Sequence, residues 1–290
     1  MQSFTGKVAV VTGAGSGIGR ALAERFAAEG MKVVVADVDA EPLARVEADL
    51  RARGTEVLAV RTDVSKAAEV DALAEQTVAA FGGVHVVCNN AGVAMTKSSW
   101  EHTIADWEWV LGVNLWGVIH GIRAFVPIML RQGEEGHVVN TASVAGLFTS
   151  GFKPSYDVSK FGVVALSEAL YQELDAIGAG VKVSVLCPGF VKTRIMESGR
   201  NRPGPLENDA AIEAAAERPE AQAVNEMLRA GITGIGTPPS EIAEQVLLAI
   251  CQEQFYVLPH DMFDGDIRQR MENILARSNP GMRRLDQASE

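Results

Sequence analysis

The chain alternates, along most of its length, between short runs of β-branched residues and longer stretches with apolar side chains at helical spacing. Apolar residues such as Ile18, Leu22 and Phe26 recur at positions that share one face of a helix. This alternation predicts an α/β fold, a doubly wound parallel sheet with helices on both faces, in a single domain of 290 residues. The seven expected strands are 8–12, 32–36, 56–61, 84–88, 137–141, 181–186 and 255–258.

Composition excludes several classes of protein. Acidic residues outnumber basic ones by 37 to 26, for a net charge of −11, which disfavours binding to nucleic acid or to an anionic membrane. The N-terminus passes within a few residues into a strand pattern, and the longest apolar runs are shorter than a membrane span, so we expect a soluble cytoplasmic protein. We interpret Cys88, Cys187 and Cys251 as buried thiols, and the five histidines lack metal-ligand spacing, so no metal is expected.

Two segments interrupt the alternation. Residues 194–236 contain several Pro and Gly around an Ala/Glu-rich helical piece, where a short connection would suffice, and we expect this insertion to form a lid over a substrate. Residues 259–290 form a C-terminal extension in which Ile267, Met271 and Ile274 have helical spacing, so part of it is expected to pack on the domain.

A glycine-rich turn follows the first expected strand and precedes a helix. Its spacing, read from Gly13, Gly17 and Gly19, is G-x-x-x-G-x-G. Glycine lets the backbone turn sharply and approach a pyrophosphate, and the helix N-terminus offers free N–H groups to the anion. The turn therefore predicts a dinucleotide site that includes Ser16 and Ile18, although a glycine cluster by itself also fits a flexible loop.

Asp37, 18 residues after Gly19, ends the second expected strand. A carboxylate at this position can accept hydrogen bonds from an adenosine ribose, and it would repel a 2′-phosphate. The neighbouring Ala36 and Val38 supply no cation, so NAD is predicted in preference to NADP.

Tyr156 and Lys160 lie four residues apart at the start of a helical pattern, so they share a helix face. An ammonium about 4 to 5 Å from a phenol, at an effective dielectric of ~20, contributes roughly 4 kcal/mol, or nearly 3 pKa units. This would bring the phenol pKa from about 10 to near 7, where a general base works well. Two incidental surface side chains are the alternative.

Taken together, these motifs resemble those of the short-chain dehydrogenase/reductase family, in its compact single-domain subclass. The match runs from about Lys7 to Leu258. The motifs that carry it are TGAGSGIG at 12–19, Asp63-Val64, NNAG at 89–92, Asn114 in VNLWG, Ser143, Tyr156 with Lys160, and PGFVKT at 188–193.

The resemblance implies a role for each matching position. Tyr156 is implied as general acid/base, Ser143 as the hydroxyl that orients the substrate oxygen, Lys160 as the residue that holds the nicotinamide ribose, and Asn114 as the anchor of a proton relay. Further residues are implied in cofactor binding: Asp63 and Val64 at the adenine, Asn90, Ala91 and Gly92 along the cleft, and Pro188, Gly189, Val191 and Thr193 near the carboxamide.

Segments expected to border the substrate are apolar. They contribute Val93, Met95, Val144, Leu147, Phe148, Phe190 and Met196. We therefore expect a hydrophobic secondary alcohol or ketone. Arg194, Arg200 and Arg202 could contact an anionic group, but solvated lid residues are an equal interpretation.

The stretch 104–130 carries more apolar side chains than one sheet face can cover. A partner subunit would bury the excess, and the resemblance also implies a homodimer or homotetramer. The leading prediction is thus an NAD-dependent oxidoreductase. Its alternatives are an NAD-binding sensor or scaffold without turnover, and an epimerase or dehydratase that uses NAD transiently.

Overall fold

The computed structural model describes residues 1–215 and 218–281. All strand pairs are parallel, in the order β3-β2-β1-β4-β5-β6-β7. The predicted seven-stranded, doubly wound parallel sheet is confirmed, although the seventh strand is shorter than expected. The strands are β1 (Val8–Thr12), β2 (Lys32–Asp37), β3 (Val57–Arg61), β4 (Val86–Asn89), β5 (Gly136–Thr141), β6 (Val181–Leu186) and β7 (Tyr256–Val257).

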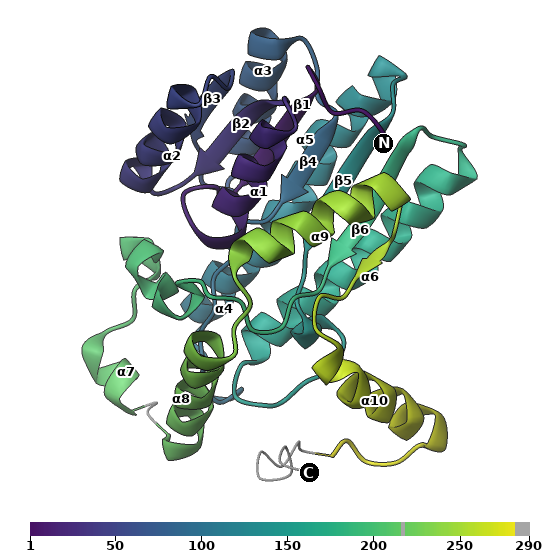
Figure 1. The fold of residues 1–290 in the computed structure, drawn as a ribbon. Helices are drawn as coiled ribbons and strands as arrows, with labels where there is room; N and C mark the ends of the chain where they lie inside the picture. Colours follow the sequence, from purple (N-terminus) through teal and green to yellow (C-terminus); the bar gives the residue numbers. More distant parts are fainter. Residues whose placement is uncertain (216–217, 282–290) are drawn as a thin grey trace.

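Helices cover both faces of this sheet (Figure 1). The helices are α1 (Gly17–Ala28), α2 (Ala40–Ala52), α3 (Ala67–Phe81), α4 (Ile104–Leu111), α5 (Gly117–Gln132), α6 (Pro154–Ala176), α7 (Ala210–Ala215), α8 (Pro219–Gly234), α9 (Pro239–Gln252) and α10 (Asp264–Ala276). Short 3-10 turns occur at Val144–Gly146, Ile195–Asn201, Gly204–Leu206 and Asp261–Phe263.

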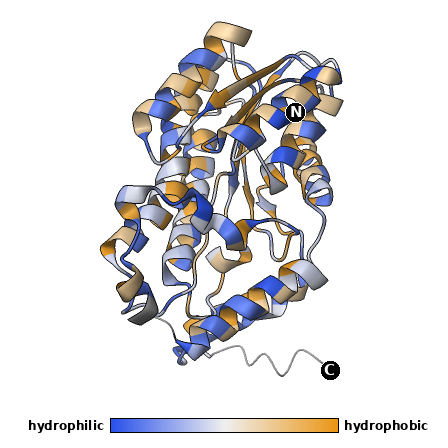
Figure 2. Cartoon of the chain, turned by 90° about the vertical axis from the view of Figure 1, so that its left-hand side faces the viewer, coloured by the Kyte–Doolittle hydropathy of each residue, from blue (hydrophilic) through white to orange (hydrophobic). Residues whose placement is uncertain are grey.

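Successive strand residues point to opposite faces of the sheet and so build two cores. Val11 of β1 packs with Leu22 of α1 and Ile242 of α9 on one face. Val10, its neighbour, packs with Leu73 of α3 and Phe125 of α5 on the other. All of these side chains are buried, and the burial of each contributes roughly 1.5–3 kcal/mol to the stability of the fold. Figure 2 shows mainly hydrophobic strands between helices in which hydrophobic and hydrophilic residues alternate.

The strand order reverses next to β1, which pairs with β2 on one side and β4 on the other. The connections that follow β1 and β4 therefore diverge and leave a crevice at the carboxyl edge of the sheet, where ligands bind in open α/β folds. The glycine turn follows β1 and the NNAG motif spans the end of β4, so both motifs lie at this crevice.

The stretch 104–132 is one long helical segment with a π-helical turn at Gly112–Trp116. By length and composition it could cross a membrane, which corrects the expectation that no segment reaches a membrane span. However, Trp109 and Phe125 are buried against the domain, as in a core helix of a soluble protein. Part of the apolar excess is thus buried within the chain, whereas Ile104, Trp116 and Leu130 are 73%, 53% and 39% exposed. A cytoplasmic location stays a prediction.

The insertion and the C-terminal extension lie beyond the carboxyl ends of the strands, where α7, α8 and α10 gather (Figure 1). Residues 216–217 of the expected lid and 282–290 of the expected extension lie outside the described residues. In α10, Ile267 packs beside the buried Phe263, whereas Met271 and Ile274 are largely exposed. The extension therefore packs on the domain through Phe263 and Ile267, and through Arg270, whose guanidinium lies 4.8 Å from the centre of the Phe161 ring.

Two of the three cysteines are buried, as predicted. Cys88 and Cys187 are inaccessible, and burial raises the pKa of the Cys187 thiol to about 12. Cys251, in α9, is partly exposed, so the prediction of a buried thiol is wrong at that position. Within the described residues, no group of acidic, histidine and cysteine side chains is arranged to hold a metal ion.

Candidate active site

A cavity of about 990 Å³ opens at the carboxyl edge of the sheet. Residues of the predicted motifs line it, together with the segment 194–206 and one face of α8. Three of the predicted site residues do not line it: Gly19 of the glycine turn, Asn114, and Leu147 of the expected substrate pocket. The lining residues that were predicted are Gly13, Ser16, Gly17, Ile18, Asp37, Asp63, Val64, Asn90, Ala91, Gly92, Val93, Met95, Ser143, Val144, Phe148, Tyr156, Lys160, Pro188, Gly189, Phe190, Val191, Thr193 and Met196.

The glycine turn has no room for side chains at two of its positions. Gly13 has a positive φ of 66°, and a Cβ there would lie 2.8 Å from the Cα of Ala91. A Cβ on Gly19 would lie 2.2 Å from the main-chain oxygen of Gly13. Gly19 therefore permits close packing of α1 under the turn, and Gly13 permits the turn to pack against Ala91 in the loop after β4. This cradle fits the diphosphate of a dinucleotide at the start of α1.

Asp37 closes the adjoining end of the cavity. Its Oδ2 accepts a hydrogen bond from the Gly15 N–H at 2.8 Å, and its Oδ1 accepts one from the Asp39 N–H at 2.9 Å. Burial raises the pKa of Asp37 above its usual value, against the effect of these two hydrogen bonds. The carboxylate is therefore held in a fixed orientation at the end of β2, where a ribose hydroxyl could donate to it.

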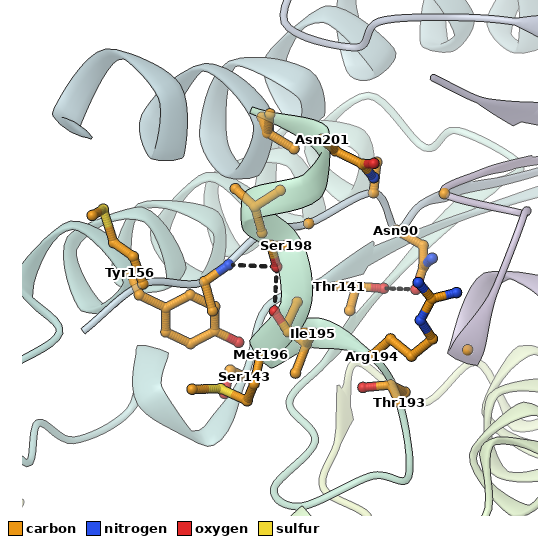
Figure 3. A pocket seen from close by; sticks show the side chains of 18 of the residues that line it. Asn90, Thr141, Ser143, Tyr156, Thr193, Arg194, Ile195, Met196, Ser198 and Asn201 are labelled. Atoms are coloured by element: carbon orange, nitrogen blue, oxygen red, sulfur yellow. Dashed lines mark hydrogen bonds between the residues drawn. The ribbon is translucent and has the colours of Figure 1, made fainter. Parts of the chain in front are cut away.

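The ends of β1, β4 and β5 are joined by side-chain hydrogen bonds. Thr12 Oγ1 accepts from the N–H groups of Asn90 and Ala91, at 2.9 and 3.1 Å. The Asn90 amide donates to the Thr12 oxygen at 3.0 Å, and the Thr141 hydroxyl donates to Asn90 Oδ1 at 3.3 Å (Figure 3). Asn90 is thereby fixed across the crevice floor. The sequence analysis did not identify Thr12 or Thr141, because their role depends on which strands are neighbours.

Ser143 and Tyr156 approach each other on one wall of the cavity (Figure 3). Ser143 follows β5, where its hydroxyl donates to the Pro188 oxygen at 3.2 Å. Tyr156 and Lys160 lie on the first turns of α6, whose start is favoured by Pro154 at its first position. The Lys160 ammonium is buried, donates to the Thr141 oxygen at 2.9 Å, and lies 5.6 Å from the centre of the Tyr156 ring.

The predicted phenol pKa near 7 is wrong for the protein by itself. Burial raises the pKa of Tyr156 to about 12, and the interaction with the Ser143 side chain only partly opposes this. Burial also lowers the pKa of Lys160 to about 8. The predicted phenol pKa near 7 includes the attraction between the two groups, but it omits the cost of removing a phenolate and an ammonium from water.

Asn114 lies on the π-helical turn and is fully buried. Its Oδ1 accepts from the Val93 N–H at 2.8 Å, and its Nδ2 donates to the Val93 oxygen at 2.9 Å and to Ser159 Oγ at 3.0 Å. The side chain therefore holds the loop after β4 against the start of α6. π-helical turns are often found at functional sites. The relay role expected for Asn114 stays a prediction.

The half of the cavity beyond Tyr156 is largely apolar. Leu147, expected in it, instead packs against a separate core cluster that includes Val163 and Val185, because its side chain points away from the cavity. The lid expected at 194–236 contains α8, but its individual lining residues were not predicted, nor was the contribution of the C-terminal extension. The additional apolar lining residues are Trp109, Leu206, Val224, Met227, Leu228, Ile232 and Phe263.

Phe263 completes an aromatic cluster at this end. Its ring centre lies 6.0 Å from that of Phe148 and 5.8 Å from that of Phe190. A Cβ on Gly189 would lie 2.2 Å from the Phe263 ring, so glycine permits this approach. The ring is held near Gly189 by His260, whose Nδ1 accepts from the Gly189 N–H at 3.0 Å. Helical spacing in the extension predicted packing, but it did not identify Phe263.

A parallel sheet that reverses its order beside a glycine cradle, with a serine, a tyrosine and a lysine on the opposite wall, defines a dinucleotide-binding protein of the dehydrogenase type. A sequence model of the short chain dehydrogenase family matches residues 7–203. The chain belongs to the short-chain dehydrogenase/reductase family.

Several relatives align with this chain over most of its length. The CLA biosynthesis dehydrogenase/reductase of Lactiplantibacillus plantarum is 32% identical over 288 residues, covering 99% of each chain. The 1-deoxy-11-beta-hydroxypentalenate dehydrogenase of Streptomyces exfoliatus is 40% identical over 210 residues, 72% of this chain and 75% of that one. The crystal structure of a short chain dehydrogenase/reductase from Burkholderia phymatum in complex with NAD has 46% identity and a TM-score of 0.93, covering 97% of this chain and 98% of that one.

Proposed function

We propose that this protein is an NAD-dependent oxidoreductase that transfers hydride between a hydrophobic secondary alcohol or ketone and the nicotinamide. The observation that carries the proposal is the presence of Ser143, Tyr156 and Lys160 on the wall of the same cavity that contains the glycine cradle. The two relatives described above are named as dehydrogenases, which supports a redox reaction.

The residues present fit NAD. The glycine turn would hold the diphosphate, Asp37 the adenosine ribose, and Lys160 the nicotinamide ribose. NAD is favoured over NADP because an ionised Asp37 would repel the 2′-phosphate of NADP at close range. The NAD complex of the Burkholderia phymatum protein supports the same choice of cofactor.

Bound NAD supplies the hydride acceptor or donor, and the protein's own residues handle the proton. In the oxidation direction, Tyr156 takes the proton of the substrate hydroxyl, and in the reduction direction it returns it to the ketone oxygen. Ser143 donates a hydrogen bond to that oxygen and so orients it beside the phenol. Lys160, held by the Thr141 oxygen, favours the phenolate by its charge.

An apolar substrate is supported by the lining of the far half of the cavity. The aromatic cluster of Phe148, Phe190 and Phe263 lines the cavity together with Met196 and Met227. Flat aromatic walls and flexible methionine side chains suit a cyclic or aromatic body. The cations near this half already have partners, Lys153 with Asp157, Arg194 with Glu197, and Arg200 with main-chain oxygens, which disfavours a phosphorylated sugar.

The test is a comparison of Tyr156→Phe with Tyr171→Phe. Tyr171 lies on the same helix but is 40% exposed and outside the cavity, so it is a matched control. Screening cyclic and aromatic secondary alcohols at 340 nm should give a loss of roughly 10²- to 10⁴-fold in kcat for Tyr156→Phe, with NADH binding retained. Undiminished turnover in that variant would refute the proposal, and product formation without net NADH would favour an epimerase or dehydratase.

We also propose that the protein self-associates through the outer surfaces of α5 and α6. Trp116, Leu130 and Val158 are 53%, 39% and 50% exposed, which supports a covered face in the assembled protein. Light scattering should give the mass of a dimer or tetramer, and Trp116→Glu should lower it. A monomeric mass at micromolar concentration would refute this part of the proposal.

A further inference from the structure

A buried cluster of charges lies at the start of α4, outside the catalytic residues. Asp106 is inaccessible, and its Oδ2 accepts hydrogen bonds from the Thr103 N–H at 2.9 Å and from Lys97 Nζ at 3.0 Å. Its Oδ1 lies 2.7 Å from Arg202 Nη2 and accepts from Asn208 Nδ2 at 2.8 Å. Burial by itself raises the pKa of Asp106, but these interactions outweigh it and lower the pKa to about 2. The carboxylate is therefore ionised at neutral pH.

Two of these partners belong to residues 194–208, a segment that we call the strap. The strap runs past the catalytic wall and along the cavity, as Ile195, Met196 and Ser198 show in Figure 3. Its lining residues come from most of its length: Arg194, Ile195, Met196, Ser198, Arg200, Asn201, Pro203, Pro205 and Leu206. The position of the strap therefore sets the width of the cavity along both the cofactor half and the substrate half.

Elsewhere along the strap, Arg229 of α8 donates to the main-chain oxygen of Met196 at 2.8 Å. Arg194 pairs with Glu197, and Arg200 donates to main-chain oxygens, all within the strap itself. Ser198 Oγ accepts from the Ala94 N–H at 3.2 Å. Among the described residues, Arg202 with Asp106 is the one ion pair that joins the strap to the rest of the chain.

Arg202 also packs against the cavity wall. Its guanidinium lies 5.2 Å from the centre of the Trp109 ring, and Trp109 lines the cavity. Leu206, two residues before Asn208, packs against the cluster of Val93 and Trp109. The same few residues thus attach the strap by charge, by stacking and by apolar contact. A buried pair of this kind is little screened by salt, in contrast to an exposed pair.

We propose that Asp106 is a positioning residue that, through Arg202 and Asn208, fixes the strap as a wall of the cavity and so determines how long the dinucleotide stays bound. The inference takes the dinucleotide from the proposed function and makes no use of the substrate. Asp106 itself touches neither the cavity nor the predicted catalytic residues, so its effect on the cofactor acts through the strap.

The test compares the full-length wild-type protein with Asp106→Asn. Asparagine keeps an oxygen that can accept the Thr103 N–H at the helix start, but it removes the charge that holds Arg202. We expect the rate of NADH release, measured by stopped-flow fluorescence, to increase at least about tenfold. A tenfold change in rate corresponds to about 1.4 kcal/mol. Hydrogen–deuterium exchange of peptides from residues 194–208 should accelerate in the cofactor-free protein as well.

Arg202→Met is the second variant, because it keeps apolar contact with Trp109 and removes the guanidinium. It should reproduce both effects if Asp106→Asn does not fold. Asp71→Asn is the matched control, since Asp71 pairs with Arg123 at 2.6 Å on the exposed surface of α3 and α5. It should leave release and exchange unchanged.

Lower thermal stability with wild-type NADH release and strap exchange would overturn the proposal and assign Asp106 a purely structural role. If the wild-type protein binds NADH and both variants release it within twofold of the wild-type rate, this proposal is overturned and the proposed function stays intact. Failure of the wild-type protein to bind NADH would overturn both.

Discussion

The Lys160 ammonium donates to the main-chain oxygen of Thr141 at 2.9 Å, while it lies 5.6 Å from the centre of the Tyr156 ring. The lysine is therefore held by the end of β5 and acts on the phenol at a distance through its charge. In the protein alone this attraction is smaller than the cost of burying a phenolate, which raises the pKa of Tyr156 to about 12.

Tyr156 should accordingly remain protonated in the cofactor-free protein. Tyrosinate absorbance of the wild type minus that of Tyr156→Phe should show no ionisation of Tyr156 below about pH 10, given an ordinary tyrosine pKa of about 10. Addition of NAD should shift the ionisation to lower pH, because its positive nicotinamide favours the phenolate. Ionisation near pH 7 without NAD would show that burial is not the dominant effect.

The pH dependence of turnover follows from the same group. Alcohol oxidation needs the phenolate, so kcat/KM should rise with pH below the pKa of Tyr156, whereas ketone reduction needs the phenol and should fall above it. Ser143→Ala removes an interaction that lowers the phenol pKa, and should therefore move both profiles to higher pH. The measurement is the pH profile of kcat/KM in each direction, from pH 6 upward, for the wild type and Ser143→Ala. A shift to lower pH in the variant would show that Ser143 does not lower the pKa of Tyr156.

Asp37→Asn should reduce the preference for NAD over NADP. Asparagine can still accept the Gly15 N–H, but it no longer repels a 2′-phosphate. We expect the ratio of kcat/KM for NAD to that for NADP to fall by about 10-fold or more, equivalent to at least about 1.4 kcal/mol. Asp175→Asn, at an exposed position on α6, is the control. An unchanged ratio would mean that the carboxylate does not select the cofactor.

Phe263→Ala should change substrate selectivity toward bulkier alcohols, because it removes one wall of the aromatic cluster formed with Phe148 and Phe190. The measurement is the ratio of kcat/KM for a bulky to a compact cyclic alcohol, which should rise with NADH affinity unchanged. Met262→Ala, 47% exposed beside it, should leave the ratio as in the wild type. Equal ratios in all three proteins would exclude Phe263 as a selectivity residue.

His137 should make the fold sensitive to mild acid. It is fully buried on β5 with Nε2 2.7 Å from Ser184 Oγ, and burial, with the nearby N-terminus and Lys182, lowers its pKa to about 3. Between pH 6.5 and 3 the unfolded chain binds a proton that the folded chain does not. As the pH falls through this range, the contribution of His137 to the free energy of unfolding therefore decreases by about 1.4 kcal/mol per pH unit.

His137→Gln should remove that contribution. Asp157 has the opposite sign, because burial raises its pKa to about 6 and the folded protein then binds the extra proton. The wild-type slope therefore combines both groups, and the informative quantity is the difference in slope between variant and wild type, from urea unfolding at pH 4.5 to 6. Parallel slopes would show that His137 does not titrate as proposed.

Much of the fold was predictable because it depends on local patterns. β-branched runs predicted the strands within a few residues, and helical spacing predicted the helices between them, since both patterns can be recognised from residues that are close together in the sequence. β7 was the exception, reduced to Tyr256–Val257 at the sheet edge, where it pairs with β6 alone. The glycine turn was recognisable because its geometry excludes other residues at Gly13 and Gly19.

The sequence by itself determined which residue types could carry redox chemistry and the order in which they follow their strands. Only the tertiary structure decided that Phe263, from the far end of the chain, closes the substrate half, that Leu147 turns away from it, and that Arg202 is held by a buried Asp106. The physical reason is that these contacts join segments distant in sequence. Desolvation, which reverses the expected pKa of Tyr156, likewise depends on everything packed around a group rather than on its neighbours along the chain.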